Sequence, residues 1–385
     1  MKRKDFLLAT GSLITAAMLS RLDVQASKFD NTRGDNYRPT PSVLDVPILQ
    51  VLCYGVNSPN PHNTQAWKFK IETDTSCLFY VDETRLLTAT DPIARQIHIG
   101  CGCFIALAEI GARELGYGMQ IDYLPEGDYS YHEIGKKPLA KLKINKINPP
   151  KDPLFNVIYK RQTLRTIYHG NLISNDEFNN IVEISQPKYS AIELINNSAP
   201  LKEALDILYK GMEVECYDWH AFDESRKWFR VKEDIALKKD GLNLRVSGVK
   251  GLNLWVSEQM LTGYPSKLWH DNRTINGLLA GHYEKVMSSK GIVLFKTTSN
   301  QLADWIKCGQ DYARFQLAAC QKGIGMHPLS QVLQEYPSMQ QLSSAFEQMM
   351  QIEKPMKIQM AVRIGRSHPD GFSYRRNTKD LIINS

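Results

Sequence analysis

The stretch from Asn57 to Trp67 concentrates residues suited to a shaped polar loop. It reads NSPNPHNTQAW. Pro59 and Pro61 fix the backbone angle φ and remove amide donors, while Asn60 and Asn63 tolerate turn conformations and carry side-chain amides that hydrogen-bond. Such a loop can cradle a planar, polyol-bearing ligand. An ordinary surface connection whose asparagines satisfy their own backbone is an equal alternative.

A second candidate group lies in the segment YKRQTLRTIYHG, which runs from Tyr159 to Gly170. Arg161 and Arg165 are four positions apart with Thr163 between them. We expect them close to a helix start, where exposed amides and the helix dipole favour an anion. The segment is therefore a candidate phosphate site, although two solvated arginines on a helix face are the commoner outcome of this spacing.

The elements around the first loop follow from their patterning. Residues 44–56 have helical spacing and lead into the loop. After it, KFKI and CLFYVD alternate like two strands of a hairpin, with Trp67 as an apolar anchor. Asp91 and Pro92 then resemble an N-cap and a first helical residue, so we expect a helix to begin there and to be largely buried. His98 on this helix is interpreted as a satisfied core histidine.

The sequence pattern of this predicted helix recurs later in the chain, which indicates a diverged duplication. Gly102 and Gly116 are fourteen positions apart, and so are Gly309 and Gly323. Between them Ala106 matches Ala313, Ile110 matches Leu317 and Ala112 matches Ala319. The second helix follows KGIVLF, a predicted buried strand, and precedes KIQMAVRIG, another.

These motifs resemble the nitroreductase family of flavoproteins. The 57–67 stretch is similar to the family's Pro-x-x-x-Asn-x-Gln-x-Trp loop, and its His-Asn-Thr-Gln core is most similar to the Acg-like branch. The resemblance implies an α+β, nitroreductase-like fold in which two related units pack as an intrachain pseudo-dimer. It also implies FMN as the cofactor, with the 57–67 loop from one unit touching the ribityl side of an FMN bound mainly by the other.

The resemblance assigns cofactor-binding residues position by position. The segment 161–165 is similar to the family's Arg-Arg-Ser-x-Arg element, which holds the phosphate and the N1/O2 edge of the ring, and Arg165 is the candidate for that edge. Backbone amides after the second helix would face N5, and a closing basic pair would grip the phosphate. No catalytic side chain and no metal ligand is expected. The implied cofactor-binding residues are Pro59, Asn60, Pro61, Asn63, Arg161, Gln162, Thr163, Arg165, Ser330, Gln331, Arg375 and Arg376.

The family resemblance leaves two classes of function open. One is an oxidoreductase that passes hydride from a nicotinamide-type donor, NAD(P)H, through FMN N5 to a nitroaromatic or quinone. The other is an FMN-sequestering or storage protein with little reductase activity. A structural paralogue that binds no flavin is a third and weaker hypothesis. Because the loop and the basic elements belong to different units, we expect one complete FMN site in a monomer that acts as a pseudo-dimer.

The N-terminus has the pattern of an export signal. Lys2, Arg3 and Lys4 precede an apolar run from Phe6 to Leu19, and the small residue Ala26 fits a cleavage site. The start resembles a twin-arginine signal with Lys4 in place of the second arginine, and a Sec-type signal is the alternative. We expect a periplasmic protein, or a membrane-anchored one if the signal is not cleaved. The expected organisation is a signal peptide at 1–26, a linker at 27–43, a first unit at 44–150, and a second unit at 151–385 with a lid-like insertion at about 201–285.

Composition narrows the class of partner. The 385 residues suffice for two cores, and 47 basic residues against 41 acidic ones give a mild positive charge without a long single-sign run. This balance suits a phosphate-bearing ligand and gives no dense basic face for nucleic acid. The seven cysteines have no metal-ligand spacing and are interpreted as buried thiols. The aromatic residues of the insertion fit a lid over the flavin and plain helix packing equally well.

Overall fold

The computed structural model describes residues 38–263, 266–368 and 371–383. The expected signal peptide at 1–26, and the linker as far as residue 37, lie outside the described residues. Among the residues described, no helix is both long and apolar enough to cross a membrane.

The first unit is built on a four-stranded antiparallel sheet in the order β1-β2-β4-β3. The expected hairpin is confirmed, and Trp67 at its start is 1% exposed and packs on Phe104 with 4.9 Å between ring centroids. The elements are α3 (Pro47–Gly55), β1 (Trp67–Thr73), β2 (Ser76–Val81), α4 (Arg95–Glu114), β3 (Tyr117–Tyr123) and β4 (Ala140–Lys146).

The second unit repeats this arrangement in the sheet order β5-β8-β10-β9, again antiparallel throughout. Both predicted strands are present, at 291–297 and 357–365. The elements are α5 (Asn175–Ser185), β5 (Ala191–Ile195), β8 (Gly291–Thr297), α12 (Leu302–Gln321), β9 (Gly325–Pro328), α13 (Gln340–Met349) and β10 (Lys357–Gly365).

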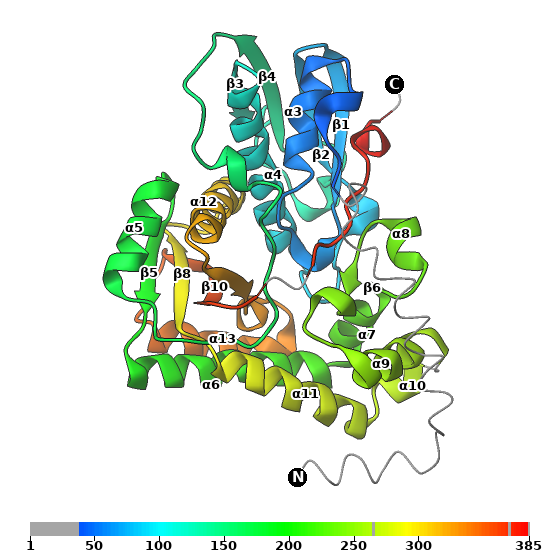
Figure 1. Ribbon diagram of the computed structural model, residues 1–385, viewed down its shortest axis with the longest axis vertical. Coiled ribbons are helices and arrows are strands. Elements are labelled where there is room, and N and C mark those ends of the chain that lie inside the picture. The colour runs from blue at the N-terminus through cyan, green and yellow to red at the C-terminus, as the bar shows by residue number, and fades with distance from the viewer. Residues whose placement is uncertain (1–37, 264–265, 369–370, 384–385) are drawn as a thin grey trace. The chain divides into compact units, whose positions relative to one another are not determined.

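The predicted duplication is confirmed by the two central helices. Residues of α12 follow their counterparts in α4 by 207 positions at both ends (302 minus 95, and 321 minus 114). Gly116 and Gly323, also 207 apart, follow the two helices with φ of 80° and 69°. Figure 1 shows α4 and α12 side by side between the two sheets. The fold is therefore α+β, with two related units packed as an intrachain pseudo-dimer.

One helix start differs from its prediction. The helix α4 begins at Arg95 rather than at Pro92, because Ala94 at the N-cap has left-handed angles (φ 59°) that break the helical run. The Asp91 carboxylate still accepts the first free amides, from Gln96 N at 3.1 Å and Ile97 N at 2.9 Å. His98 is buried and bonded to Ala94 O and to the Tyr129 hydroxyl at 2.7 Å, as a core histidine should be.

The insertion between β5 and β8 is mostly helical and packs on the second sheet. Its longest helices, α6 and α11, lie together, and α6 and α13 cover the face of the sheet opposite α12. Phe222 and Trp269 stack inside it, with ring centroids 4.8 Å apart. Its elements are α6 (Ser198–Tyr217), α7 (Trp219–Lys227), β6 (Phe229–Arg230), α8 (Asp234–Lys238), β7 (Leu242–Asn243), α9 (Gly251–Gly263), α10 (Ser266–Trp269) and α11 (Asn272–Met287).

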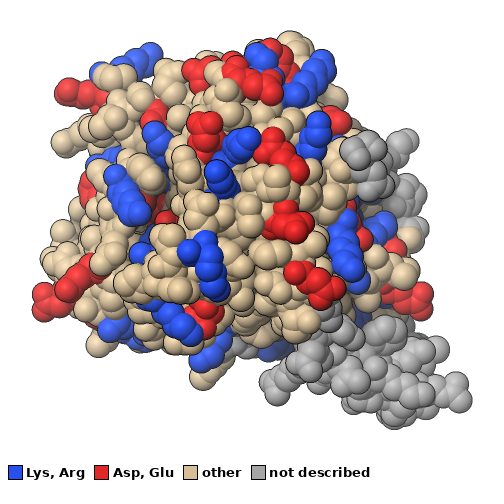
Figure 2. Space-filling model, turned by 90° about the horizontal axis from the view of Figure 1, so that it is seen from above, with Lys and Arg blue, Asp and Glu red and all other residues tan. Residues whose placement is uncertain are grey.

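Charges of both signs mix on the surface seen in Figure 2, where no large area of one sign is present on that face. All seven cysteines are free thiols, six buried and Cys320 half-buried. Within the described chain there is no group of three or more histidine, cysteine or acidic side chains arranged to hold a metal ion.

The two units meet at glycines that tolerate no side chain. A Cβ on Gly102 would lie 1.8 Å from Ile306 O, and a Cβ on Gly309 would lie 2.0 Å from Ile99 O. We predict that Gly102→Ala lowers the free energy of unfolding by about 2 kcal/mol or more, because the helices must separate. Gly277→Ala is the control: Gly277 lies inside α11 with nothing near its Cβ position, so alanine should stabilise by about 0.5–1 kcal/mol. Equal denaturation midpoints for the two variants would contradict the close crossing.

Candidate functional site

A cavity forms where the two units, the insertion and the C-terminal segment meet. The cavity volume is about 40 Å³. That is room for a few water molecules. The lining residues are Arg38, Pro59, Asn60, Asn63, Arg161, Gln162, Thr163, Arg165, Gly241, Leu242, Asn243, Val246, Gly371, Ser373 and Arg375.

Eight of the twelve residues implicated by the sequence line this cavity, although the two motifs are about a hundred positions apart. From the loop come Pro59, Asn60 and Asn63; from the basic segment come Arg161, Gln162, Thr163 and Arg165; and Arg375 comes from the C-terminal segment.

The structure does not bring the other four into the cavity. Pro61 packs on α4, where its Cδ would be 3.0 Å from a Cβ on Gly100. Ser330 and Gln331, whose backbone amides were expected to face N5, are not among the lining residues. The Ser330 hydroxyl lies 3.9 Å from Met360 Sδ, and the side-chain amide of Gln331 lies 3.7 Å from Met212 Sδ on α6. Arg376 is not among the lining residues, and its guanidinium donates to Gln65 O at 3.3 Å and to Asp380 O at 3.0 Å.

The basic segment is not at a helix start, contrary to the prediction. Residues 159–170 are irregular, and α5 begins only at Asn175. Thr163 instead forms a parallel bridge with Met326 beside β9, and Leu164 N donates to Met326 O at 3.0 Å. The cavity therefore uses guanidinium groups rather than a helix dipole to attract an anion.

The loop from Asn57 to Trp67 is held in a strained conformation. His62, Asn63 and Gln65 all have positive φ, at 48°, 53° and 51°. Left-handed angles cost a non-glycine residue about 1 kcal/mol or more, and such strain persists only where surrounding contacts impose it. Concentrated strain of this kind is typical of functional sites.

Side-chain hydrogen bonds impose that conformation. Arg161 donates to Asn57 O at 3.3 and 3.1 Å and to the Gln316 side chain at 3.0 Å. The Asn63 amide donates to Gly241 O at 3.1 Å and to Tyr374 O at 3.2 Å, and its oxygen accepts from Arg375. The loop is thus fixed by the second unit, the insertion and the C-terminal segment together.

Positive charge accumulates in the cavity without a balancing anion. Burial, then Arg161 and Arg375, lower the pKa of Arg38 well below its usual range. Burial, then Arg161 and Arg165, do the same to the pKa of Arg375. Burial is also the main cause that lowers the pKa of Arg161 and of Arg165. Within the described residues none of the four forms an ion pair, so the cavity favours a ligand with negative charge.

Arg165 is the cation least committed to the protein. Its guanidinium lines the cavity and has no hydrogen-bond partner among the residues described. The guanidinium groups of the other three all donate to backbone carbonyl oxygens. Arg165 therefore has the most donors available for a ligand.

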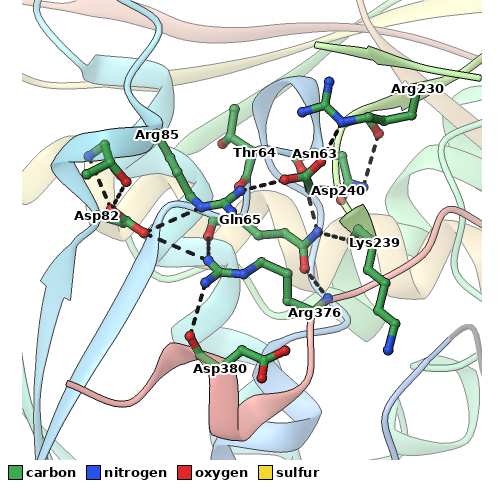
Figure 3. A network of polar contacts seen from close by, with 12 residues as sticks. Asn63, Thr64, Gln65, Asp82, Arg85, Arg230, Lys239, Asp240, Arg376 and Asp380 are labelled. Carbon is green, nitrogen blue, oxygen red and sulfur yellow. Dashed lines mark hydrogen bonds and ion pairs between the residues drawn. The ribbon is translucent and has the colours of Figure 1, made fainter. Parts of the chain in front are cut away.

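The sequence did not single out Arg38 or the segment from Lys239 to Val246. Figure 3 shows how the insertion reaches the loop: the Gln65 amide donates to Lys239 O at 2.8 Å, and Arg376 N donates to Gln65 Oε1 at 2.8 Å. Asp240 binds Arg85 of the first unit and Arg230 of the insertion, both at 2.7 Å.

A buried hydrogen-bonded chain makes a second link between loop and insertion. The Ser225 hydroxyl of α7 donates to Glu215 Oε1 of α6 at 2.8 Å and lies 3.0 Å from His62 Nε2. With the serine proton directed to the carboxylate, His62 Nε2 is the donor to Ser225. Burial raises the pKa of Glu215 to about 7, and burial followed by Arg165 lowers the pKa of His62 to about 4.

Comparisons with known proteins are partial. No protein-family model matches the chain. Over 95 residues the chain is 29% identical to a Mycobacterium tuberculosis (strain H37Rv) protein named "Putative NAD(P)H nitroreductase Rv3131", and equally to its counterpart MT3217 in strain CDC 1551. The matched stretch covers 24% of this chain and about a quarter (27%) of each relative.

Two solved structures show weaker likeness. The FMN-dependent nitroreductase NfnB from Mycobacterium smegmatis, in complex with NADPH, is 13% identical over 60% of this chain and 96% of its own, with a TM-score of 0.37. A nitroreductase with bound FMN from Bacteroides fragilis NCTC 9343 is 12% identical over 57% of this chain and 90% of its own, with a TM-score of 0.30.

We predict that Asp240→Ala loosens the insertion where it lines the cavity, because Arg85 and Arg230 lose their shared carboxylate. Amide hydrogen exchange at residues 239–246 should accelerate at least tenfold. Asp234→Ala is the control. Asp234 and Lys238 form an exposed ion pair across one helical turn, and such a pair contributes about 0.5 kcal/mol or less to the free energy of unfolding. Unchanged exchange in the Asp240 variant would contradict the proposed role of this ion pair.

We predict that Glu215 makes stability depend on pH. Its folded pKa of about 7 exceeds its ordinary value of 4.5, so its contribution is complete below about pH 4.5 and is lost as pH rises through 7. The free energy of unfolding of wild type minus that of Glu215→Gln should therefore fall by roughly 2–3 kcal/mol between pH 4.5 and 8. Urea titrations at several pH values measure this difference in the free energy of unfolding. A difference that does not change with pH would exclude a buried, protonated carboxyl at Glu215.

Proposed function

We propose that the protein is an FMN-binding oxidoreductase of the nitroreductase type. The observation that carries the proposal is the cavity itself. The 57–67 loop of the first unit and the 161–165 segment of the second, which resemble complementary halves of one family site, line it together with Arg375. The short match to the mycobacterial relatives supports the same class.

The charge and donors of the cavity suit the phosphate of FMN. Four guanidinium groups lie around it without a protein counter-ion among the described residues, and the Nε atoms of Arg38 and Arg375 are buried without hydrogen-bond partners. Buried donors of this kind are rare in folded proteins and suggest a ligand. Phosphate oxygens match guanidinium forks well.

The space is narrow for the flavin ring. Gly241, Leu242, Asn243 and Val246 of the insertion lie against the cavity, and the remaining room is that of a few water molecules. We infer that this segment moves outward when FMN enters. Once returned, it would exclude water from the ligand, which strengthens every electrostatic interaction inside.

Bound FMN would supply hydride transfer at N5. The chain's contribution is to position it and tune its charge. Arg165 would hold the N1/O2 edge, where its guanidinium favours the reduced, more negative form. Asn60 and Thr163 would offer hydrogen bonds to the polyol chain, and Arg375, held by the Asn63 side chain, would contact the phosphate. We propose NAD(P)H as the donor and a nitroaromatic or quinone as the acceptor.

A single complete site per chain is part of the proposal. The second unit's counterpart of the 57–67 loop is the short connection from Gln186 to Ser190. There, Asp311 of α12 accepts the amides of Lys188, Tyr189 and Ser190 at 2.7–2.9 Å. A carboxylate occupied by protein amides at this place suits neither a phosphate nor a flavin.

The narrow cavity also favours a second candidate, a protein that holds FMN with little turnover. The two are distinguished by mixing the FMN-loaded protein with NADPH under anaerobic conditions. Bleaching of the flavin absorbance, with recovery on adding a quinone, supports the oxidoreductase. A spectrum that NADPH leaves unchanged, while dithionite bleaches it, supports sequestration.

We predict that Arg165→Ala raises the Kd for FMN about tenfold or more, because a hydrogen bond to a charged group contributes about 1.5–3 kcal/mol. If the flavin still binds, its reduction potential should fall, since the reduced form loses a nearby cation. Arg273→Ala, at an exposed position on α11, is the matched control. Wild-type affinity and potential in the Arg165 variant would remove the assignment.

A further inference from the structure

Arg38 belongs to the segment that the sequence treats as a linker, yet it lies inside the cavity. It is 7% exposed, and its guanidinium stacks on the Phe372 ring with 4.4 Å to the centroid. Two of its nitrogens donate to main-chain oxygens of the second unit, to Ile158 O at 3.0 Å and to Arg161 O. The residue is therefore fixed in place before any ligand arrives.

The third nitrogen of Arg38 has no partner. Its Nε is buried and makes no hydrogen bond within the part of the chain described. Arg375, which is 5% exposed, repeats this pattern: its terminal nitrogens are taken by Asn63, Tyr374 and Ser58, and its Nε is buried and unpaired. Arg38 and Arg375, from opposite ends of the described chain, thus line one cavity, and each keeps a buried Nε–H group without a partner.

Arg161 is a poorer candidate for this contact. Its Nε and both terminal nitrogens already donate to Asn57 O and Gln316 Oε1. The sequence pattern assigned phosphate contact to Arg161, but the geometry makes it a positioning residue that holds the loop. The orphaned donors are those of Arg38 and Arg375.

An oxyanion with several acceptor oxygens satisfies both groups at once. A neutral acceptor leaves the two cations mutually repelling in a buried space, whereas a phosphate monoester neutralises both and offers three oxygens. We propose that Arg38 and Arg375 clasp the phosphate monoester of the ligand. The proposal rests on the proposed function, in which that ligand is FMN, and it adds Arg38 to the site.

The test compares FMN with riboflavin, which lacks the phosphate, on the full chain stripped of flavin. Fluorescence titrations give the Kd of each ligand for wild type, Arg38→Gln and Arg38→Lys. We expect Arg38→Gln to raise the Kd for FMN at least tenfold while the Kd for riboflavin changes less than twofold, and Arg38→Lys to lie between. Arg113→Gln, a partly exposed arginine outside the cavity, should leave both constants unchanged.

Two results would contradict the proposal that Arg38 and Arg375 bind the phosphate. One is wild-type affinity for FMN in Arg38→Gln. The other is an equal loss of FMN and riboflavin binding, which would mean that Arg38 only holds Ile158 and Arg161 in place.

A failure of the proposed function, in which wild type binds no flavin, can be distinguished from a failure of the Arg38–Arg375 phosphate site. If wild type binds neither flavin, inorganic phosphate becomes the probe of the clasp. A rise in the wild-type unfolding temperature with phosphate, at constant ionic strength, that is absent in Arg38→Gln supports the clasp without FMN. An equal response of the two proteins, or none in either, contradicts it.

Discussion

The close crossing of α4 and α12 is the constraint on which the site depends. At Gly102 and Gly309 each helix backbone fills the place where a side chain of the other would stand. This contact brings the two units together, so that a loop from one lies against a basic segment from the other. Arg161 of the second unit then donates a hydrogen bond across the interface to Asn57 O of the first unit. The cavity is thus a product of the pseudo-dimer and belongs to neither unit alone.

The second constraint is the cost of gathering buried guanidinium groups. Carbonyl oxygens satisfy several of their donors but do not neutralise their charge. After burial itself, neighbouring arginines lower the pKa of Arg38 and of Arg375. Unpaired buried charge is costly, which makes the ligand-free site the less stable state. The strained loop and the insertion are held by the same arginines and amides. Ligand binding and local order should therefore be coupled.

The sequence predicted the duplication and the composition of the loop because both depend on local features, glycine spacing and turn chemistry. It missed Arg38 and the 239–246 segment because their contacts cross 120 positions or more and no periodicity marks them. It placed 161–165 near a helix start because the arginine spacing resembles a helix face. In the structure the segment instead pairs with β9 through Thr163 and Met326. It could not separate Arg375 from Arg376, since the contacts that distinguish them, Arg375 with Asn63 and Arg376 with Gln65, cross more than 300 positions.

The stoichiometry of flavin on the purified full chain tests the account most directly. FMN is removed, restored by titration, and counted against protein from its absorption spectrum. We expect saturation at one FMN per chain, because only one interface between the units brings the loop and the cations together among the described residues. Saturation at two per chain, or no FMN retained at all, would contradict it.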